Sequence, residues 1–217
     1  GLVISGGTRG RVEKCEASRN ELSGIYLVGS AEQLKIEDNI FNNNQHSGIC
    51  CSGYSRVSVI HNQCWYNQMS GIEVEGEANP WLERNSCGYN QRHGIAYYNR
   101  AKGKVQENQC VSNQMAGIAV QDEATPTLKN NSCYGNTFSG LIYSDQSAGI
   151  ATANEFRKNK IHGIQVKDEA SPILEENICI GNSGYGIQIE RGAKPKIGKN
   201  NLRFNESGEI KKPGLFG

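Results

Sequence analysis

The sequence repeats one pattern nine times in 217 residues: a glycine, then Ile or Leu, any residue and a residue that is apolar or Tyr. The repeats begin at Gly1, Gly24, Gly48, Gly71, Gly94, Gly117, Gly140, Gly163 and Gly186, so the spacing is 23 residues with one step of 24. A fixed period of this length is typical of units that cannot bury their own apolar face and stack on copies of themselves. The chain is therefore predicted to fold as a solenoid.

Each repeat contains three short segments whose apolar residues are predicted to face inward. The positions one and three residues after the glycine are occupied as in a β-strand, which has a period of two. Further apolar columns follow about 11 and 16 residues after the glycine. Three such segments indicate a triangular coil, and parallel crossovers of this kind are nearly always right-handed.

Two asparagine columns favour β-coils over paired helices. Asparagine tolerates left-handed backbone, and stacked amides can hydrogen-bond along a column. Helices would need stretches of about 10 to 15 residues with a 3.6-residue period, which the 26 glycines oppose. The columns consist of Asn39, Asn62, Asn85, Asn108, Asn131, Asn154, Asn177 and Asn200, and of Asn20, Asn44, Asn67, Asn90, Asn113, Asn136, Asn159, Asn182 and Asn205.

The repeat resembles the right-handed parallel β-helix repeats of the pectate-lyase-like superfamily. The best match runs from Gly117-Ile118-Ala119-Val120 through Ala124-Thr125-Pro126-Thr127-Leu128 to Asn131-Ser132-Cys133 and Asn136. This form is similar to the CASH-type repeats of carbohydrate-binding proteins, sugar hydrolases and the substrate-binding region of some F-box proteins. We expect an all-β, single-stranded parallel β-helix of about nine coils over residues 1–205, with residues 206–217 as a tail or partial cap.

The resemblance also implies which motifs an enzyme of this superfamily would carry. Pectate lyases use an Arg base with clustered Asp ligands for Ca²⁺, polygalacturonases use three Asp with Gly-His-Gly and Arg-x-Lys, and alginate epimerases use Asp-Pro-His. The sequence contains none of these motifs and no long insertion. It favours a non-catalytic binding scaffold that presents an extended face to a protein segment or a glycan. The alternatives are a polysaccharide lyase, epimerase or glycoside hydrolase, and a structural rod or fibre subunit.

The charge balance bears on the possible partners. With 23 basic and 22 acidic residues, the chain offers no electrostatic reason to bind nucleic acid or an acidic membrane surface. No run approaches the roughly 20 apolar residues of a membrane span. Basic side chains at both ends of the solenoid discourage end-to-end stacking, so a monomer is expected.

Five of the eight cysteines fall in one interior column. Side chains that point the same way into a core make poor disulfide partners, so we expect reduced, packed thiols and a cytoplasmic protein. If the column were oxidised, an extracellular location would follow. The thiols cannot converge on one point, so no metal site is expected there. The column consists of Cys64, Cys87, Cys110, Cys133 and Cys179.

Two outward-facing groups are candidate ligand-binding residues. Glu73, Glu75, Tyr98 and Gln121 lie on the outer face of the first strand, where their carboxylates, amide and ring suit a sugar chain or form an ordinary solvated face. Exposed aromatic residues at a corner grip sugar rings or apolar partner side chains. These aromatic residues are Trp65, Tyr66, Tyr89 and Tyr134.

An acidic column at another corner is the candidate catalytic site. Asp122, Asp145 and Asp168 follow one another in consecutive coils, about 4.8 Å apart. Neighbouring carboxylates at this spacing resemble a retaining glycosidase pair, and a column of them can recruit Ca²⁺. Solvated turn residues with Lys167 as counter-ion are the favoured interpretation, so no cofactor and no response to calcium are expected.

Overall fold

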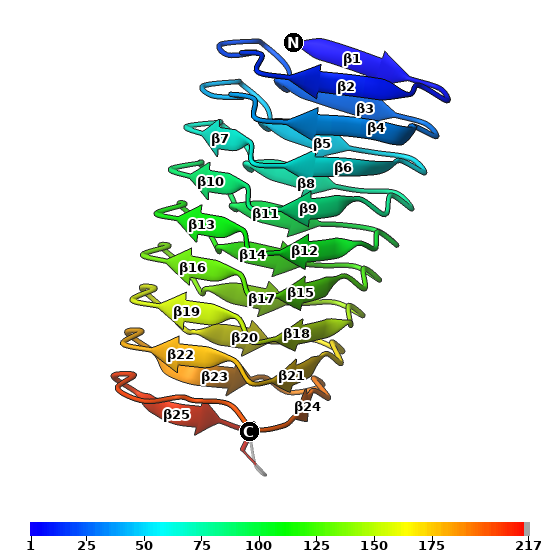
Figure 1. Cartoon of the computed structure of the whole chain (residues 1–217). Coiled ribbons are helices and arrows are strands. Elements are labelled where there is room, and N and C mark those ends of the chain that lie inside the picture. The colour runs from blue at the N-terminus through cyan, green and yellow to red at the C-terminus, as the bar shows by residue number, and fades with distance from the viewer. Residues whose placement is uncertain (215–217) are drawn as a thin grey trace.

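The computed structural model describes residues 1–214 and forms a single parallel β-solenoid (Figure 1). Each turn of the chain adds one strand to sheet A and one to sheet B, and the middle turns add a third to sheet C. Within this part of the chain every strand pairing is parallel, and there is no helix that is long and apolar enough to cross a membrane. The predicted β-helix is confirmed.

The three sheets are stacks of short strands. In stacking order, sheet A contains β1 (Leu2–Ser5), β3 (Ile25–Val28), β5 (Ile49–Cys51), β8 (Ile72–Val74), β11 (Ile95–Tyr97), β14 (Ile118–Val120), β17 (Leu141–Tyr143), β20 (Ile164–Val166), β23 (Tyr185–Ile189) and β25 (Gly208–Lys211). Sheet B contains β2 (Gly10–Glu13), β4 (Glu32–Glu37), β6 (Arg56–Ile60), β9 (Trp81–Glu83), β12 (Lys104–Gln106), β15 (Thr127–Lys129), β18 (Ile150–Thr152), β21 (Ile173–Glu175) and β24 (Lys196–Ile197). Sheet C contains β7 (Gln63–Trp65), β10 (Ser86–Gly88), β13 (Gln109–Val111), β16 (Ser132–Tyr134), β19 (Glu155–Arg157) and β22 (Ile178–Ile180).

The sequence period is also the register of the sheets. Ile95 pairs with Ile72 on one side and with Ile118 on the other, so each residue stands over its counterpart one repeat away. The single 24-residue step is absorbed in sheet B, where the pairing of β4 with β6 shifts between Glu32 and Lys35. Gln33 there has a positive φ of 57°. A local bulge thus preserves the register of all later coils.

The interior is a narrow apolar rod made by one column from each sheet. Residues such as Ile118, Leu128 and Cys133 are fully buried. The repeat glycines lie just before the strands of sheet A and allow the chain to pass close to sheet C. A methyl group on Gly117 would lie 2.6 Å from Cys133 Cβ and 2.7 Å from the Gly140 carbonyl oxygen. Glycine is therefore needed here because there is no space for a side chain, rather than for a special backbone conformation.

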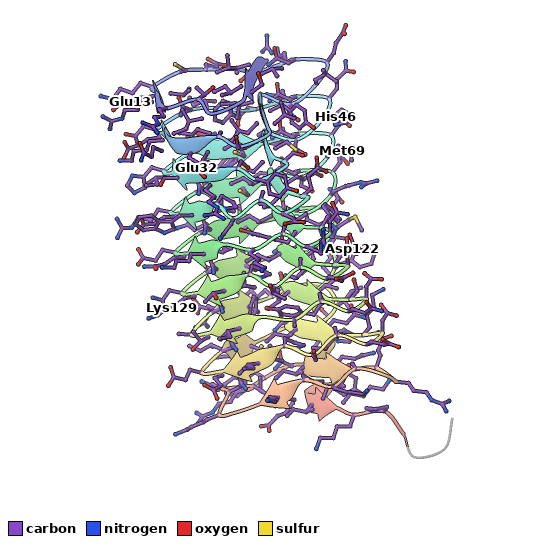
Figure 2. All side chains as sticks on the ribbon, turned by 90° about the vertical axis from the view of Figure 1, so that its right-hand side faces the viewer. Glu13, Glu32, His46, Met69, Asp122 and Lys129 are labelled. Carbon is purple, nitrogen blue, oxygen red and sulfur yellow. The ribbon has the colours of Figure 1, made fainter. Side chains whose placement is uncertain are left out.

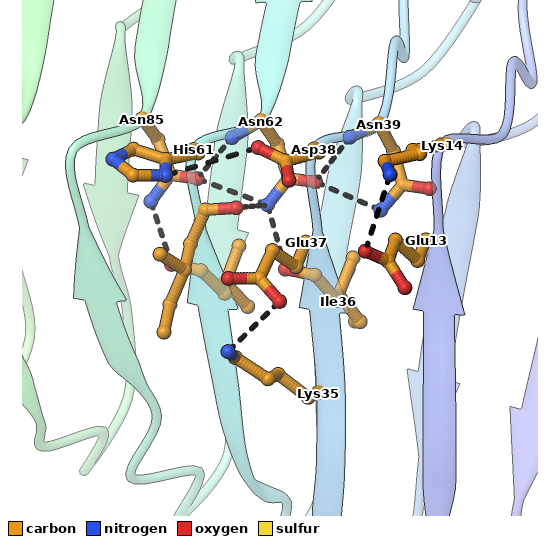
Figure 3. Close-up of polar contacts among 12 residues, drawn as sticks. Glu13, Lys14, Lys35, Ile36, Glu37, Asp38, Asn39, His61, Asn62 and Asn85 are labelled. Atoms are coloured by element: carbon orange, nitrogen blue, oxygen red, sulfur yellow. Dashed lines mark hydrogen bonds and ion pairs between the residues drawn. The ribbon is translucent and has the colours of Figure 1, made fainter.

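Two buried asparagine ladders tie consecutive coils together, as predicted. The Asn62 amide Nδ2 donates to Asn85 Oδ1 at 3.0 Å and to the Ile36 carbonyl at 2.9 Å, while the Asn62 backbone N–H donates to the same Asn85 oxygen (Figure 3). The second ladder repeats this arrangement at Asn113 and Asn136. Each amide is satisfied by the coils above and below it, which is the condition for burying it.

The interior column of sheet A contains two tyrosines whose hydroxyl groups lack a partner. Tyr97 and Tyr143 are fully buried, and burial raises the pKa of both hydroxyls. Where this column has tyrosine, the corner six residues later has Gly103 or Gly149. A Cβ on Gly103 would lie 2.5 Å from the Pro80 carbonyl oxygen and 3.0 Å from the Tyr97 hydroxyl oxygen, and one on Gly149 would lie 2.3 Å from the Pro126 carbonyl oxygen. Both glycines also have positive φ, so the backbone of this corner requires glycine at these two positions.

The end of the chain continues sheet A beyond residue 205. Strand β25 pairs in parallel with β23 and places Ile210 beside Ile187. The segment expected as a tail or cap thus supplies a further sheet strand. The last part of that segment, residues 215–217, lies outside the described residues.

Replacing Tyr97 with Phe should stabilise the protein by about 1 kcal/mol, because it removes a buried hydroxyl that has no hydrogen-bond partner. Urea denaturation measures this change. Tyr54→Phe, at an exposed position, is the control and should leave stability unchanged. A loss of stability in Tyr97→Phe would mean that the hydroxyl is satisfied in solution.

Replacing Cys110 with Ala should lower the free energy of unfolding by about 1–2 kcal/mol through lost packing in the fully buried column. Cys15→Ala, at an exposed cysteine, should change it by less than about 0.5 kcal/mol. All eight thiols are free in the structure, and mass spectrometry of the unreduced protein tests this in solution. A Cys87–Cys110 or Cys110–Cys133 bridge would contradict both the packing and the expected reducing compartment.

Candidate functional site

The outer face of sheet A carries a groove over its first four strands. Its floor is a single cross-strand column, in which Val3 pairs with Tyr26, Tyr26 with Cys50 and Cys50 with Glu73. One wall is formed by long side chains two residues before each repeat glycine, namely Leu22, His46 and Met69. Figure 2 shows His46 and Met69 along the same side of the solenoid. The groove has a volume of about 390 Å³, within the range of small-ligand sites.

Two carboxylates lie side by side in this groove. Glu73 in β8 and Glu75 directly after it point to the same face of the sheet because strand side chains alternate. Glu73 is only 9% exposed, and its Oε1 has no hydrogen-bond partner. The expectation that this face is open to solvent is therefore wrong at Glu73. Glu75 has a weak partner, since Cys50 Sγ lies 3.8 Å from its Oε1.

Burial and the carboxylates of the groove raise the pKa values of two neighbouring side chains. Burial first, and the negative charge of Glu75 second, raise the pKa of the Cys50 thiol, so it stays protonated. Burial and the charge of Glu73 likewise raise the pKa of Tyr98, which contacts Arg92. The groove therefore holds two carboxylates beside a wall made of apolar Leu22 and Met69 and the imidazole of His46.

Tyr98 and Gln121 continue the outer column of Glu75 into the next two coils but do not line the groove. Gln121 Nε2 donates to Ser144 Oγ at 3.3 Å, and this contact occupies its amide. Of the four residues expected on this face, the structure brings only Glu73 and Glu75 into one site. The wall residues Leu22, His46 and Met69 were missed, although a column of long side chains before each glycine was visible in the sequence.

The predicted aromatic group comes together only in part. The Tyr66 and Tyr89 rings stack with centroids 5.1 Å apart, and Trp65 meets both edge-on at 6.1 and 5.6 Å. Trp65 Nε1 donates to Ser86 Oγ at 2.9 Å. Tyr134 stands apart, with Val111 between it and the cluster in sheet C and Lys158 Nζ 6.0 Å from its ring centroid. Although the rings stack on each other, Tyr66 and Tyr89 remain exposed.

The acidic column is part of the turn structure. Asp122, Asp145 and Asp168 all have positive φ values, between 55° and 59°. Asp145 Oδ2 accepts the backbone N–H of Asp122 at 3.2 Å, and Asp168 Oδ2 accepts that of Asp145 at the same distance. Lys167 Nζ lies 3.5 Å from Asp168 Oδ2. Preceding coils have Asn99 or glycine in this position, which are the residues that tolerate left-handed backbone.

The buried histidines have structural roles. His93 Nδ1 accepts the Ala116 backbone N–H at 3.2 Å, and burial lowers the pKa of His93 to about 4. His162 Nδ1 accepts the Tyr185 N–H at 2.9 Å. In residues 1–214, no three His, Cys, Asp or Glu side chains are grouped so that they would hold a metal ion.

Solved structures with the same architecture include two epimerases and a tailspike protein. The chain superposes on the Azotobacter vinelandii mannuronan C-5 epimerase AlgE4 A-module with a TM-score of 0.64 and 16% identity, over 94% of this chain and 58% of that one. The periplasmic alginate epimerase AlgG gives 0.58 and 15%, over 97% and 66%. The Dettilon tailspike protein gives 0.53 and 12%, over 96% and 59%. These likenesses show the fold alone, and the chain spans less than two thirds of each structure.

Sequence comparison identifies the family more directly. Curated proteins include no match to this chain by sequence. The family model described as the right handed beta helix region matches residues 1–87 and 70–211, which together cover nearly the whole chain. The predicted handedness agrees with this family, as do the parallel sheets and asparagine ladders. The chain belongs to the right handed beta helix region family.

Proposed function

We propose that this protein is a non-catalytic scaffold that binds a polysaccharide in the groove on the outer face of sheet A. The observation that carries the proposal is the unpartnered, buried Oε1 of Glu73 inside a preformed groove. Buried polar groups in native structures nearly always have partners, so an orphaned acceptor in a groove is a position where a ligand donor belongs.

The lining of the groove suits a sugar better than a purely apolar ligand. Tyr26 and Met69 offer surfaces for the C–H faces of sugar rings, and the two carboxylates accept hydrogen bonds from ring substituents. A groove with apolar walls and a few polar groups is the usual composition of a ligand site. A protein segment is the other candidate occupant, and a peptide that competes with every bound glycan would favour it.

The similar structures support polysaccharide as the general ligand class, because two of them are named as alginate or mannuronan epimerases. The groove argues against alginate itself. Its described lining contains Glu73 and Glu75, with His46 as its one basic side chain and no Lys or Arg, so we expect a chain of uronates to be repelled. The proposed ligand is therefore a glycan without a high negative charge.

Catalysis is the alternative that one observation favours. Glu73 and Glu75 share one groove, and two carboxylates flanking a glycosidic bond are what a glycoside hydrolase uses. However, adjacent same-face positions of one strand place both groups on the same side of a bound sugar, whereas hydrolysis needs them on opposite sides. Release of reducing ends from bound oligosaccharides tests this alternative, and we expect none.

A glycan array that includes neutral, anionic and cationic oligosaccharides should show retention of neutral or cationic chains and none of uronates. The best array ligand should then bind Tyr26→Ala up to about tenfold more weakly in calorimetry, because the ring that packs on the sugar is removed. Tyr54→Ala, at an exposed tyrosine outside the groove, is the control. Failure of every oligosaccharide to bind would overturn the proposed function.

Replacing Asp145 with Asn should leave glycan binding unchanged and alter the free energy of unfolding by less than about 0.5 kcal/mol. The asparagine amide oxygen can still accept the Asp122 backbone N–H, and it tolerates the φ of 59°. Thermal denaturation should show no stabilisation by calcium in either form. A calcium-dependent rise in melting temperature that is lost in Asp145→Asn would show that the column binds the ion.

A further inference from the structure

Glu73 has a buried acceptor, Oε1, for which the described residues supply no hydrogen-bond donor. Its side chain is more than nine-tenths buried, and no ion pair within 4 Å involves it. Three polar groups have other partners: Cys50 lies against Glu75, Arg92 contacts Tyr98, and the Gly1 nitrogen donates to Asn20. The His46 imidazole also lines the groove, but the described residues show no ion pair within 4 Å between it and Glu73. A buried acceptor without a donor is costly, so a ligand that donates to Glu73 Oε1 gains interaction there.

The second carboxylate makes a cation a better match than a neutral hydroxyl. Glu75 lies two residues further along the same strand face, about 7 Å away by the strand rise. A ligand hydroxyl would donate to one carboxylate oxygen and would leave the negative charges of Glu73 and Glu75 without a counter-charge. An ammonium group would donate several charge-assisted hydrogen bonds and neutralise part of that charge.

The same lining is a poor match for a metal ion. Calcium takes about six to eight oxygen ligands, and the groove offers two carboxylates, the Cys50 thiol, the His46 imidazole and the Ser23 hydroxyl among apolar side chains. The described residues contain no grouping of three or more ligands. A ligand that combines a cationic group with an apolar surface packing on Tyr26 and Met69 matches both the charge and the shape of the groove.

From these observations we infer that the groove recognises a polysaccharide with free amino groups, such as a chain of β-linked glucosamine units. Glu73 receives the ammonium, Glu75 supports it, and the wall of Leu22, His46 and Met69 packs on the ring of the same or the next sugar. This inference rests on the proposed function and narrows its ligand class.

The test compares two hexasaccharides that differ in one group: hexaglucosamine and its fully N-acetylated form. Calorimetry is done at about pH 5.5, where the amino groups of the sugar are protonated. We expect the native protein to bind the amino form at least about tenfold more tightly. Glu73→Gln should remove this preference by weakening the amino form about tenfold to a hundredfold, with little effect on the acetylated form.

The matched control is Glu32→Gln, which makes the same charge change in sheet B on the far side of the coil (Figure 2). It should keep the preference in full. Thermal denaturation verifies the fold of each variant, and a melting temperature of Glu73→Gln equal to or above that of the parent is expected. If Glu73→Gln fails to fold, the affinities of the two hexasaccharides are compared on Glu75→Gln and on the native protein instead, and Glu75→Gln should reduce the preference for the amino form.

The outcomes separate this inference from the proposed function. Equal affinity for the two hexasaccharides, or binding of a neutral glycan alone, would overturn the amino-sugar inference and leave polysaccharide binding in place. A preference that survives Glu73→Gln would overturn the role of Glu73. Binding of hexalysine as tightly as hexaglucosamine would show that the groove recognises cationic chains without regard to the sugar. If neither hexasaccharide nor any array glycan binds, the proposed function fails as well.

Discussion

The stacking of identical positions one strand spacing apart is the constraint on which the rest of the structure depends. The backbone N–H and C=O groups of each coil are hydrogen-bonded to the neighbouring coils. The asparagine ladders extend this to the corners, where the Asn62 amide donates to Asn85 Oδ1 in the next coil and to the Ile36 carbonyl in the preceding coil. An amide buried in this way has no alternative partner, so a slip of one residue would leave a column of amides unsatisfied. The bulge at Glu32 and Lys35 shows how an extra residue is accommodated without such a slip.

The same regularity explains why a column of acidic side chains can have a structural role. All three corners of the coil contain residues with positive φ, and one of these corners holds Asp122, Asp145 and Asp168. Their carboxylates accept backbone N–H groups of the preceding coil, as the asparagine amides do elsewhere. A repeated acidic residue therefore reflects a repeated backbone requirement in this fold.

The candidate site lies where the repeat is least regular. Outer positions of sheet A are small in the middle coils, with Ala96 and Ala119 buried beneath their neighbours. In the first coils the same positions hold Tyr26, Cys50 and Glu73, and the wall of Leu22, His46 and Met69 rises beside them. Departures from the repeat on a solvent-facing surface are not required by stacking, and the proposed ligand site is built from them.

The architecture could be predicted from the sequence, because stacking imposes the same requirement on every coil and the requirement appears nine times. The glycine period, the inward columns and both asparagine columns were all readable as β-coils, and the structure confirms them. Which outward residues share a site followed only from the folded chain. Glu73 and Glu75 were expected on an open face, but Glu73 is buried and both line one groove with Met69 and residues of the preceding coils. Tyr134 was expected with the aromatic cluster but is separated from it by Val111. Outward positions carry no repeating packing requirement, so their environment follows from side-chain sizes in neighbouring coils, which only the folded stack brings together.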